Sequence, residues 1–151
     1  MTEKVQYITF LLDREEYALE LLKIKEIIAY RSLTRVPRMG GFIKGILNLR
    51  GVIIPVFDPR EKFGLTARDY DAHTVIFILE LAGRLFGLIV DAASDVIDLE
   101  TKDVQPTPAF STPIRSDFIQ GIGSLEDRLV ILLNADCLLN EQEMAALDKS
   151  L

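Results

Sequence analysis

The sequence predicts an all-β protein made of two small β-barrels of about five strands each, followed by a short C-terminal helix. Short runs rich in β-branched and aromatic residues alternate with turn residues along the 151-residue chain. The second half repeats the order of apolar runs found in the first half. Hydrophobic residues make up 49% of the chain and mean hydropathy is +0.23, enough for a sizeable core.

The first apolar runs predict strands that are bounded by turn and breaker residues. We expect strands at residues 5–12, 17–21 and 33–36. The segment 22–28, LKIKEII, fits either a strand or a helical turn. In a strand, Ile24, Glu26 and Ile28 would share one face, because side chains alternate with a period of two.

The segment 41–58, GFIKGILNLRGVIIPVFD, is predicted as a hairpin that turns at Arg50 and Gly51. Gly51 can adopt the positive φ that a three-residue hairpin turn with a bulge requires. Pro55 cannot donate a ladder hydrogen bond, so its strand should be an edge strand or bulged there. Asn48 and Arg50 would share a polar face, which a satisfied turn explains most simply.

The second half repeats the first at two offsets. Residues 86–88 and 95–97 match residues 17–19 and 26–28 at an offset of 69, and residues 118–122 match residues 42–46 at 76. We therefore predict one domain over residues 1–151, made of two similar units at 5–66 and 73–135 that are separate or intertwined. Further strands are expected at residues 75–81, 85–90, 95–98, 118–121 and 129–133.

Composition excludes several classes of protein. A net charge of −6 and a pI of about 4.8 argue against nucleic-acid binding, which needs clustered Lys and Arg. The apolar run at 74–93 has the length of a membrane span, but Glu80, Arg84 and Asp91 interrupt it, which favours a buried hairpin. No signal peptide opens the chain, and the single cysteine, Cys137, fits a reducing cytoplasm.

The chain carries no recognisable catalytic or metal-binding set. His73 is the only histidine and has no cysteine near it in sequence, so we expect an ordinary surface role for it and no metal. Cys137 is expected to be a small buried residue. We predict no cofactor and no enzymatic activity. Two rival functions stay open, an enzyme with an unrecognised acid site and a small-molecule sensor that uses a groove between the barrels.

Two further segments carry recognisable signals, one for a contact with a partner and one for a helix near the C-terminus. The proline-rich loop PTPAFSTPI carries Phe110, which suits an interface anchor, or else folds back over a barrel end. Asn140 and Glu143 stand at capping-box spacing, with Leu139 and Met144 at the positions of a hydrophobic staple. This pattern predicts a helix at about 140–148.

Five stretches together resemble the CheW-type chemotaxis coupling proteins, over residues 7–139. They are NLRGVIIPVFD, FIKGI, KIKEII, GLIVDAASDVIDL and DFIQGIGSLEDRLVILLN. The resemblance implies two SH3-like barrels of pseudo-twofold similarity with a groove between them. It also implies a cytoplasmic, non-catalytic adaptor that links methyl-accepting chemotaxis receptors to the histidine kinase CheA in receptor arrays at the inner membrane. Pro59 departs from the family pattern, in which an apolar residue commonly follows the aspartate.

The resemblance also implies site residues by matched position. Those at the receptor contact are Ile24, Glu26, Ile27, Lys44, Arg50 and Val96. Phe110 matches an aromatic position of a contact with the kinase. An arginine among apolar neighbours seeks a carboxylate, so we expect Glu26 and Arg50 to lie within ion-pair reach, about 4 Å, with Lys44 close by.

Overall fold

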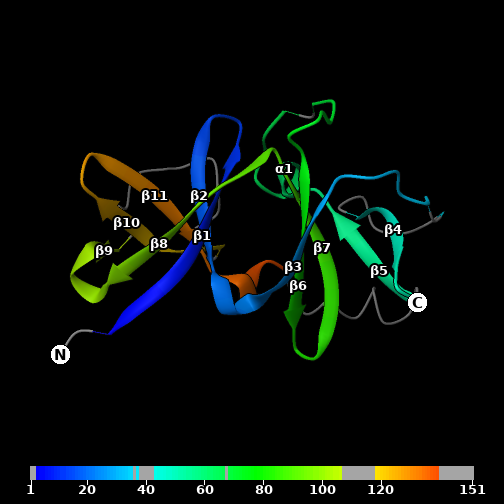
Figure 1. The fold of residues 1–151 in the computed structure, drawn as a ribbon. Coiled ribbons are helices and arrows are strands. Elements are labelled where there is room, and N and C mark those ends of the chain that lie inside the picture. Colours follow the sequence, from blue (N-terminus) through cyan, green and yellow to red (C-terminus); the bar gives the residue numbers. More distant parts are fainter. Residues whose placement is uncertain (1–2, 36, 38–42, 67, 107–117, 140–151) are drawn as a thin grey trace.

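A computed structural model describes residues 3–35, 37, 43–66, 68–106 and 118–139, and most of them form two β-sheets (Figure 1). One sheet has the strand order β8-β1-β2-β11-β10-β9, and the other has the order β3-β6-β7-β5-β4. The all-β prediction is confirmed. The first sheet has six strands because β9, a strand of only two residues, pairs with the outer side of β10.

The strands of the six-stranded sheet are β1 (Lys4–Leu12), β2 (Glu15–Glu20), β8 (Ala92–Glu100), β9 (Val104–Gln105), β10 (Ile119–Leu125) and β11 (Arg128–Leu133). Those of the five-stranded sheet are β3 (Ile24–Ala29), β4 (Ile43–Leu49), β5 (Val52–Phe57), β6 (Val75–Leu81) and β7 (Arg84–Val90). The helical turns are η1 (Leu21–Lys23), α1 (Pro59–Lys62), η2 (Thr101–Asp103) and η4 (Ala135–Cys137). The helix expected at 140–148 and the loop residue Phe110 lie outside the described residues.

Each sheet takes strands from both halves of the chain. The first two strands pair with β8 and β11, whereas β3 to β7 form the second sheet. Two parallel pairings, β2 with β11 and β5 with β7, join hairpins that are distant in sequence. The chain therefore leaves the six-stranded sheet after β2 and returns to it at β8.

Two-residue turns close all four hairpins that the structure describes. In the β4–β5 hairpin Leu49 pairs with Val52, and both Arg50 (φ 51°) and Gly51 (φ 89°) have positive φ. The positive φ predicted for Gly51 is confirmed, but the turn has two residues instead of three. Two positive φ values are typical of a type I′ turn, whose twist matches that of the flanking strands. Asn48 Oδ1 accepts a hydrogen bond from Gly51 N at 2.8 Å, so this is a satisfied turn.

The position of Pro55 in the sheet differs from the prediction. Its strand, β5, lies between β7 and β4, and Pro55 pairs with Ile46 of β4 without a bulge. The pairing of β5 with β7 begins only at Val56, so no ladder bond to β7 is required of Pro55. The bulge in this hairpin lies in β4, between Ile43 and Gly45.

Three apolar clusters explain why many strands are buried on both faces. One cluster lies within the six-stranded sheet around Tyr7 and Leu132, and another lies within the five-stranded sheet around Ile54 and Ile76. The third and largest contains residues of both sheets, among them Phe10 and Phe77, whose ring centroids are 5.3 Å apart. We call this third cluster the inter-sheet core. Burial of its apolar surface is the main force that holds the two sheets together.

Two further sequence predictions can be compared with the structure. The strand expected at 33–36 is reduced, in its described part, to a single bridge between Thr34 and Ile46. A short helix, α1, begins at Pro59, where only a polar connection was expected. Pro59 fits this first turn because a first helical residue needs no N–H partner, and Asp58 Oδ1 caps it by accepting Arg60 N at 2.9 Å. Among the described residues, no helix is long and apolar enough to cross a membrane.

Candidate functional site

Glu26 and Arg50 form the ion pair that the sequence predicts. Arg50 Nη2 lies 2.5 Å from Glu26 Oε2, and Arg50 Nη1 lies 3.2 Å from Glu26 Oε1, so the contact is bidentate. Glu26 lies in β3 and Arg50 in the β4–β5 turn, two elements near opposite edges of the five-stranded sheet. Arg31 Nη2 also donates to the backbone oxygen of Asn48 at 2.9 Å. These contacts bring the two edges together.

The pair is exposed and ionised. The Arg50 side chain is 70% exposed and that of Glu26 is 33% exposed. The hydrogen bond from Arg50 lowers the pKa of Glu26, and the same bond raises the pKa of Arg50. Exposed pairs add little to stability because water already solvates both charges. The pair therefore presents a fixed polar surface where the two edges of the five-stranded sheet come together.

A β-bulge in β3 lies between Ile24 and Glu26. The pairing shifts between Ile24, opposite Leu79, and Glu26, opposite Ile78. Ile24 therefore packs against the inter-sheet core, while Ile28 packs inside the five-stranded sheet. The expectation that Ile24, Glu26 and Ile28 share a face is wrong for Ile24, because the extra residue of a bulge reverses the alternation.

Ile27 and Val96 lie beside the inter-sheet core on edge strands of the two sheets. Ile27, 40% exposed, pairs with Phe77, which belongs to that core. Val96, 50% exposed, pairs with Ile8, which belongs to the same core. Directly opposed residues on neighbouring strands point to the same face of a sheet. We call the edge strand with Ile24 and Ile27 the β3 rim, and the edge strand with Val96 the β8 rim.

Lys44 lies at the other end of β4 from the ion pair, and Phe110 is not among the described residues. Lys44 is exposed near the start of β4, whereas Arg50 follows its end. Six positions along an extended strand, at a rise of about 3.3 Å each, separate their Cα atoms by about 20 Å. The expectation that Lys44 lies close to the pair is therefore wrong. Phe110 lies outside the described residues, and its role stays a prediction.

Two arginines with structural contacts were missed by the sequence reasoning. Arg60 is buried against Asp91, and Arg128 binds Glu16 and Asp95. Asp91 gave a signal, since a carboxylate within an apolar run of twenty residues needs a buried partner. No sequence spacing identifies that partner, because it comes from a distant element.

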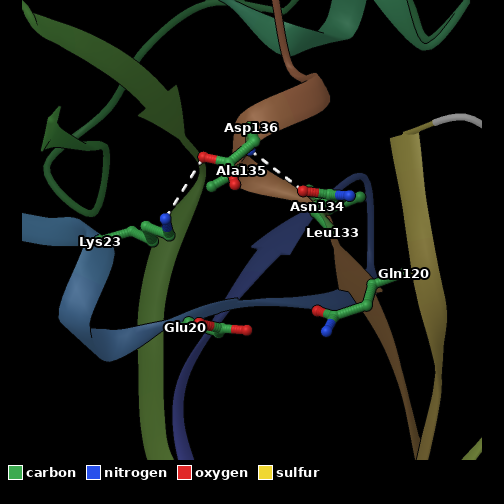
Figure 2. Close-up of a pocket in the computed structure, with 7 residues that line it drawn as sticks. All are labelled: Glu20, Lys23, Gln120, Leu133, Asn134, Ala135 and Asp136. Atoms are coloured by element: carbon green, nitrogen blue, oxygen red, sulfur yellow. Dashed lines mark hydrogen bonds and ion pairs between the residues drawn. The ribbon is translucent and has the colours of Figure 1, made fainter. Parts of the chain in front are cut away.

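A polar pocket of about 280 Å³ lies between the β2–η1 connection and the ends of β10 and β11 (Figure 2). Its lining residues are Glu20, Lys23, Gln120, Leu133, Asn134, Ala135 and Asp136. Lys23 Nζ lies 3.3 Å from Asp136 Oδ1, and the Asn134 side chain accepts from Asp136 N. Small-molecule sites are mostly apolar, so this pocket does not favour the sensor alternative.

The other potential metal ligands and nucleophiles in the described part of the chain have structural roles. That part contains no group of three or more potential ligands able to hold a metal ion. His73 donates its backbone N–H to Asp71 Oδ1 at 2.8 Å. Cys137 is a half-buried free thiol in η4, where a buried one was expected.

Comparison with known proteins shows the family. A model of the CheW-like domain matches residues 6–143. The chain is 38% identical to the chemotaxis protein CheW of Klebsiella aerogenes, with 95% of this chain and 86% of that protein covered. It is 31% identical to the chemotaxis protein CheW of Bacillus subtilis, with 89% and 86% covered. The crystal structure of the scaffolding protein CheW from Thermoanaerobacter tengcongensis superposes with a TM-score of 0.84 at 33% identity, covering 93% of this chain and 91% of that one. The chain therefore belongs to the CheW-like domain family of non-catalytic chemotaxis adaptors.

Proposed function

We propose that this adaptor couples methyl-accepting chemotaxis receptors to the histidine kinase CheA and thereby controls the activity of the kinase. The receptor contact comprises the β3 rim, the β8 rim and the Glu26–Arg50 pair, with Lys44 as an outlying basic contact. The kinase contact includes Phe110. The adaptor acts in the cytoplasm, within receptor arrays at the inner membrane.

The main observation in support of the receptor contact is the pair of apolar rims beside the inter-sheet core. Ile27 and Val96 are both β-branched, both about half exposed, and placed on the edge strands of different sheets. Apolar residues on two edge strands that flank the same core can receive the apolar face of a helix, which is a common mode of recognition. An elongated helical receptor tip suits such a surface better than a small molecule does.

The Glu26–Arg50 pair supplies the polar part of the proposed contact. The pair lies on the other face of β3 from Ile27, where the two edges of the five-stranded sheet come together. Its bidentate geometry fixes the orientation of both charged groups, so a partner meets one defined arrangement of donors and acceptors. Because the Glu26–Arg50 pair is exposed, a role in the specificity of partner binding is better supported than a role in folding.

Reconstitution with receptor cytoplasmic fragments and CheA tests the proposal. We expect the wild-type chain to change CheA autophosphorylation in a receptor-dependent manner. Val96→Ser should weaken this effect because it removes apolar surface from the β8 rim. Val5→Ser is the matched control, since Val5 is a partly exposed valine of β1 that pairs with Leu99 and so lies on the opposite face of the six-stranded sheet from Val96. No change in kinase activity at any ratio of receptor to adaptor would rule out the coupling function.

A further inference from the structure

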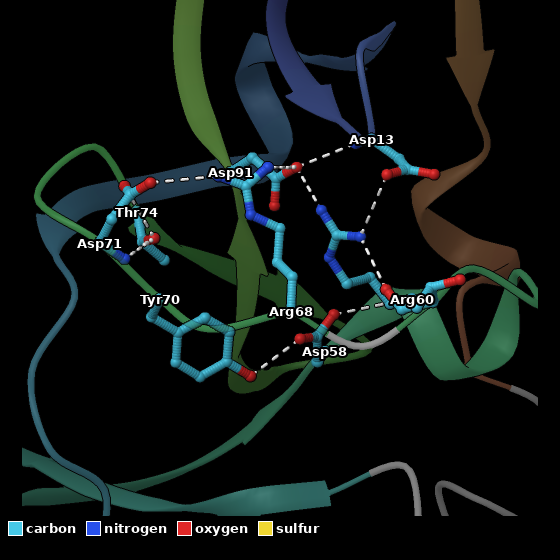
Figure 3. Close-up of polar contacts among 9 residues, drawn as sticks. Asp13, Asp58, Arg60, Arg68, Tyr70, Asp71, Thr74 and Asp91 are labelled. Carbon is cyan, nitrogen blue, oxygen red and sulfur yellow. Dashed lines mark hydrogen bonds and ion pairs between the residues drawn. The ribbon is translucent and has the colours of Figure 1, made fainter.

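Arg60 is a charged side chain buried at the junction of the two sheets. It lies in α1, directly after β5 of the five-stranded sheet, and it is 2% exposed. Figure 3 shows its guanidinium between the carboxylates of Asp13 and Asp91. Burial of a charge is costly unless hydrogen bonds and an opposite charge compensate for it. The partners of Arg60 therefore indicate why it is there.

The two carboxylates connect Arg60 to the six-stranded sheet. Asp91 links β7 of one sheet to β8 of the other, and its Oδ2 accepts a hydrogen bond from Arg60 Nη2. Asp13 lies in the β1–β2 turn, with its Oδ1 3.7 Å from Arg60 Nη1, and its backbone N–H donates to Asp91 Oδ2 at 2.9 Å. The five-stranded sheet, the six-stranded sheet and the crossing between them thus meet at one guanidinium.

Further hydrogen bonds hold this arrangement in place. Arg60 Nη1 donates to the backbone oxygen of Thr66 at 2.9 Å, and Arg68 Nη1 lies 3.2 Å from Asp91 Oδ2. Tyr70 donates its hydroxyl to Asp58 Oδ2 at 2.8 Å. Burial and this hydrogen bond raise the pKa of Tyr70, so the hydroxyl remains a donor at neutral pH.

The inter-sheet core and Arg60 hold the sheets in different ways. Apolar burial is non-directional and tolerates small rotations of one sheet against the other. A guanidinium is planar, with donors in a fixed fork, so its hydrogen bonds specify angles as well as distances. Asp91 directly precedes β8, the strand that carries Val96. A rotation at Asp91 would therefore move the β8 rim relative to the β3 rim.

We infer that Arg60 is a positioning residue that fixes the β8 rim relative to the β3 rim, through its contacts with Asp91 and Asp13. The inference rests on the proposed function in so far as the two rims receive the receptor. Arg60 itself is buried and makes no contact with a partner. Its loss should loosen the placement of the sheets before it unfolds either of them.

The placement of the sheets is measured directly with two spin labels. Ser32, after β3, and Asp98, in β8, are exposed and can be replaced by labelled cysteines in a Cys137→Ser background. Double electron–electron resonance should give a narrow distance distribution for the otherwise unchanged chain. Arg60→Lys keeps the charge but removes the planar fork, so we expect a broader or shifted distribution.

Arg128→Lys is the matched control, because Arg128 also forms a bidentate pair, but its partners among the described residues, Thr9, Glu16 and Asp95, belong to the six-stranded sheet. Its distance distribution should equal that of the unchanged chain. If Arg60→Lys does not fold by circular dichroism, the double variant Arg60→Met/Asp91→Asn replaces both buried charges with neutral groups and should give the same broadening. An unchanged distribution in whichever folded variant is measured overturns the inference.

A receptor-binding measurement then tests whether the placement of the two sheets matters for the proposed function. If the competent arrangement is populated about one tenth of the time, the apparent Kd of Arg60→Lys for a receptor fragment rises about tenfold. Arg128→Lys should bind as the wild type does. Wild-type affinity despite a broadened distribution would overturn the claim that the placement serves the contact. Absence of binding by the wild type would refute the proposed receptor contact, while the distance measurement would still decide the role of Arg60.

Discussion

The two halves of the molecule have hairpin turns and β-bulges at matching positions, but their arginine–carboxylate pairs differ in exposure. The hairpin turns at 13–14 and 82–83 are separated by the offset of 69 found in the sequence, and those at 50–51 and 126–127 by the offset of 76. The bulges in β4 and β10 also differ by 76. Turns and bulges are specific features of a backbone, so their recurrence supports our inference that residues 5–66 and 73–135 are copies of one unit.

The carboxylate–arginine pairs of the two halves differ in exposure. Asp95 matches Glu26 at the offset of 69, and it lies 3.2 Å from Arg128 Nη1. Arg128 is 33% exposed and also binds Glu16 in bidentate fashion, whereas Arg50 is 70% exposed. The comparison indicates that a similar pair stabilises the fold in one sheet and is available to a partner in the other.

Charge reversal at the exposed pair should give the largest functional effect. Glu26→Arg or Arg50→Glu places two like charges side by side and reverses the polar surface offered to the partner. We expect loss of receptor-dependent control of CheA autophosphorylation, with a circular dichroism spectrum and a melting temperature close to those of the wild type. Wild-type coupling in either single variant would contradict the role assigned to the pair.

The increase of the repeat offset from 69 to 76 indicates an insertion in the proline-rich stretch of the second half, and this stretch offers a second test of the asymmetry. Phe110→Ala should leave the fold intact and weaken the association of the adaptor with CheA, because truncation of an interface aromatic can cost about 2 kcal/mol or more. Isothermal titration with the isolated kinase measures this loss. A lower melting temperature with unchanged association would instead place Phe110 in a core.

Arg128→Ala should destabilise the fold modestly, in contrast to Arg50→Ala. Removal of Arg128 leaves the partly buried Glu16 without its main donor, and an acceptor left unsatisfied costs about 1–3 kcal/mol. Urea unfolding measures the difference. We expect no measurable change in stability for Arg50→Ala, because its pair is exposed. Equal destabilisation by the two substitutions would remove the distinction between the pairs.

The pH dependence of stability sharpens this contrast. The hydrogen bond from Arg128 lowers the pKa of Glu16 in the folded state. A lowered pKa in the folded state adds stability above the unfolded-state pKa, about 4.3, and this stability is lost as pH falls through the folded value. The wild type should therefore lose more stability than Arg128→Ala between about pH 6 and pH 3. Parallel curves for the two proteins would show that Arg128 is not the cause.

The sequence predicted elements with strong local signals and missed features that depend on register. The strand expected at 75–81 coincides with β6, because its β-branched residues and flanking turns mark both ends. The bulge in β3, which moves Ile24 to the inter-sheet core, leaves no mark in composition. Alternation along a strand is predictable only where its pairing is regular.

The same distinction applies to the candidate site. The Glu26–Arg50 pair was predictable because the family resemblance placed both residues in one contact and their chemistry is complementary. The buried contact of Arg60 with Asp91 was not, since its partners are 31 positions apart and come from different elements. Neither a motif nor a periodicity connects such residues.

The sharing of strands between the two halves has a consequence for how the chain folds as it is synthesised. Arg128 and Glu16 are 112 positions apart, and β2 gains its second neighbouring strand only when β11 pairs with it. Contacts of such sequence separation carry a large entropic cost of loop closure and slow the folding reaction. The first hairpin must therefore wait, with its apolar faces uncovered, until almost all the other strands have left the ribosome. Before that point it should depend on chaperones for protection from aggregation.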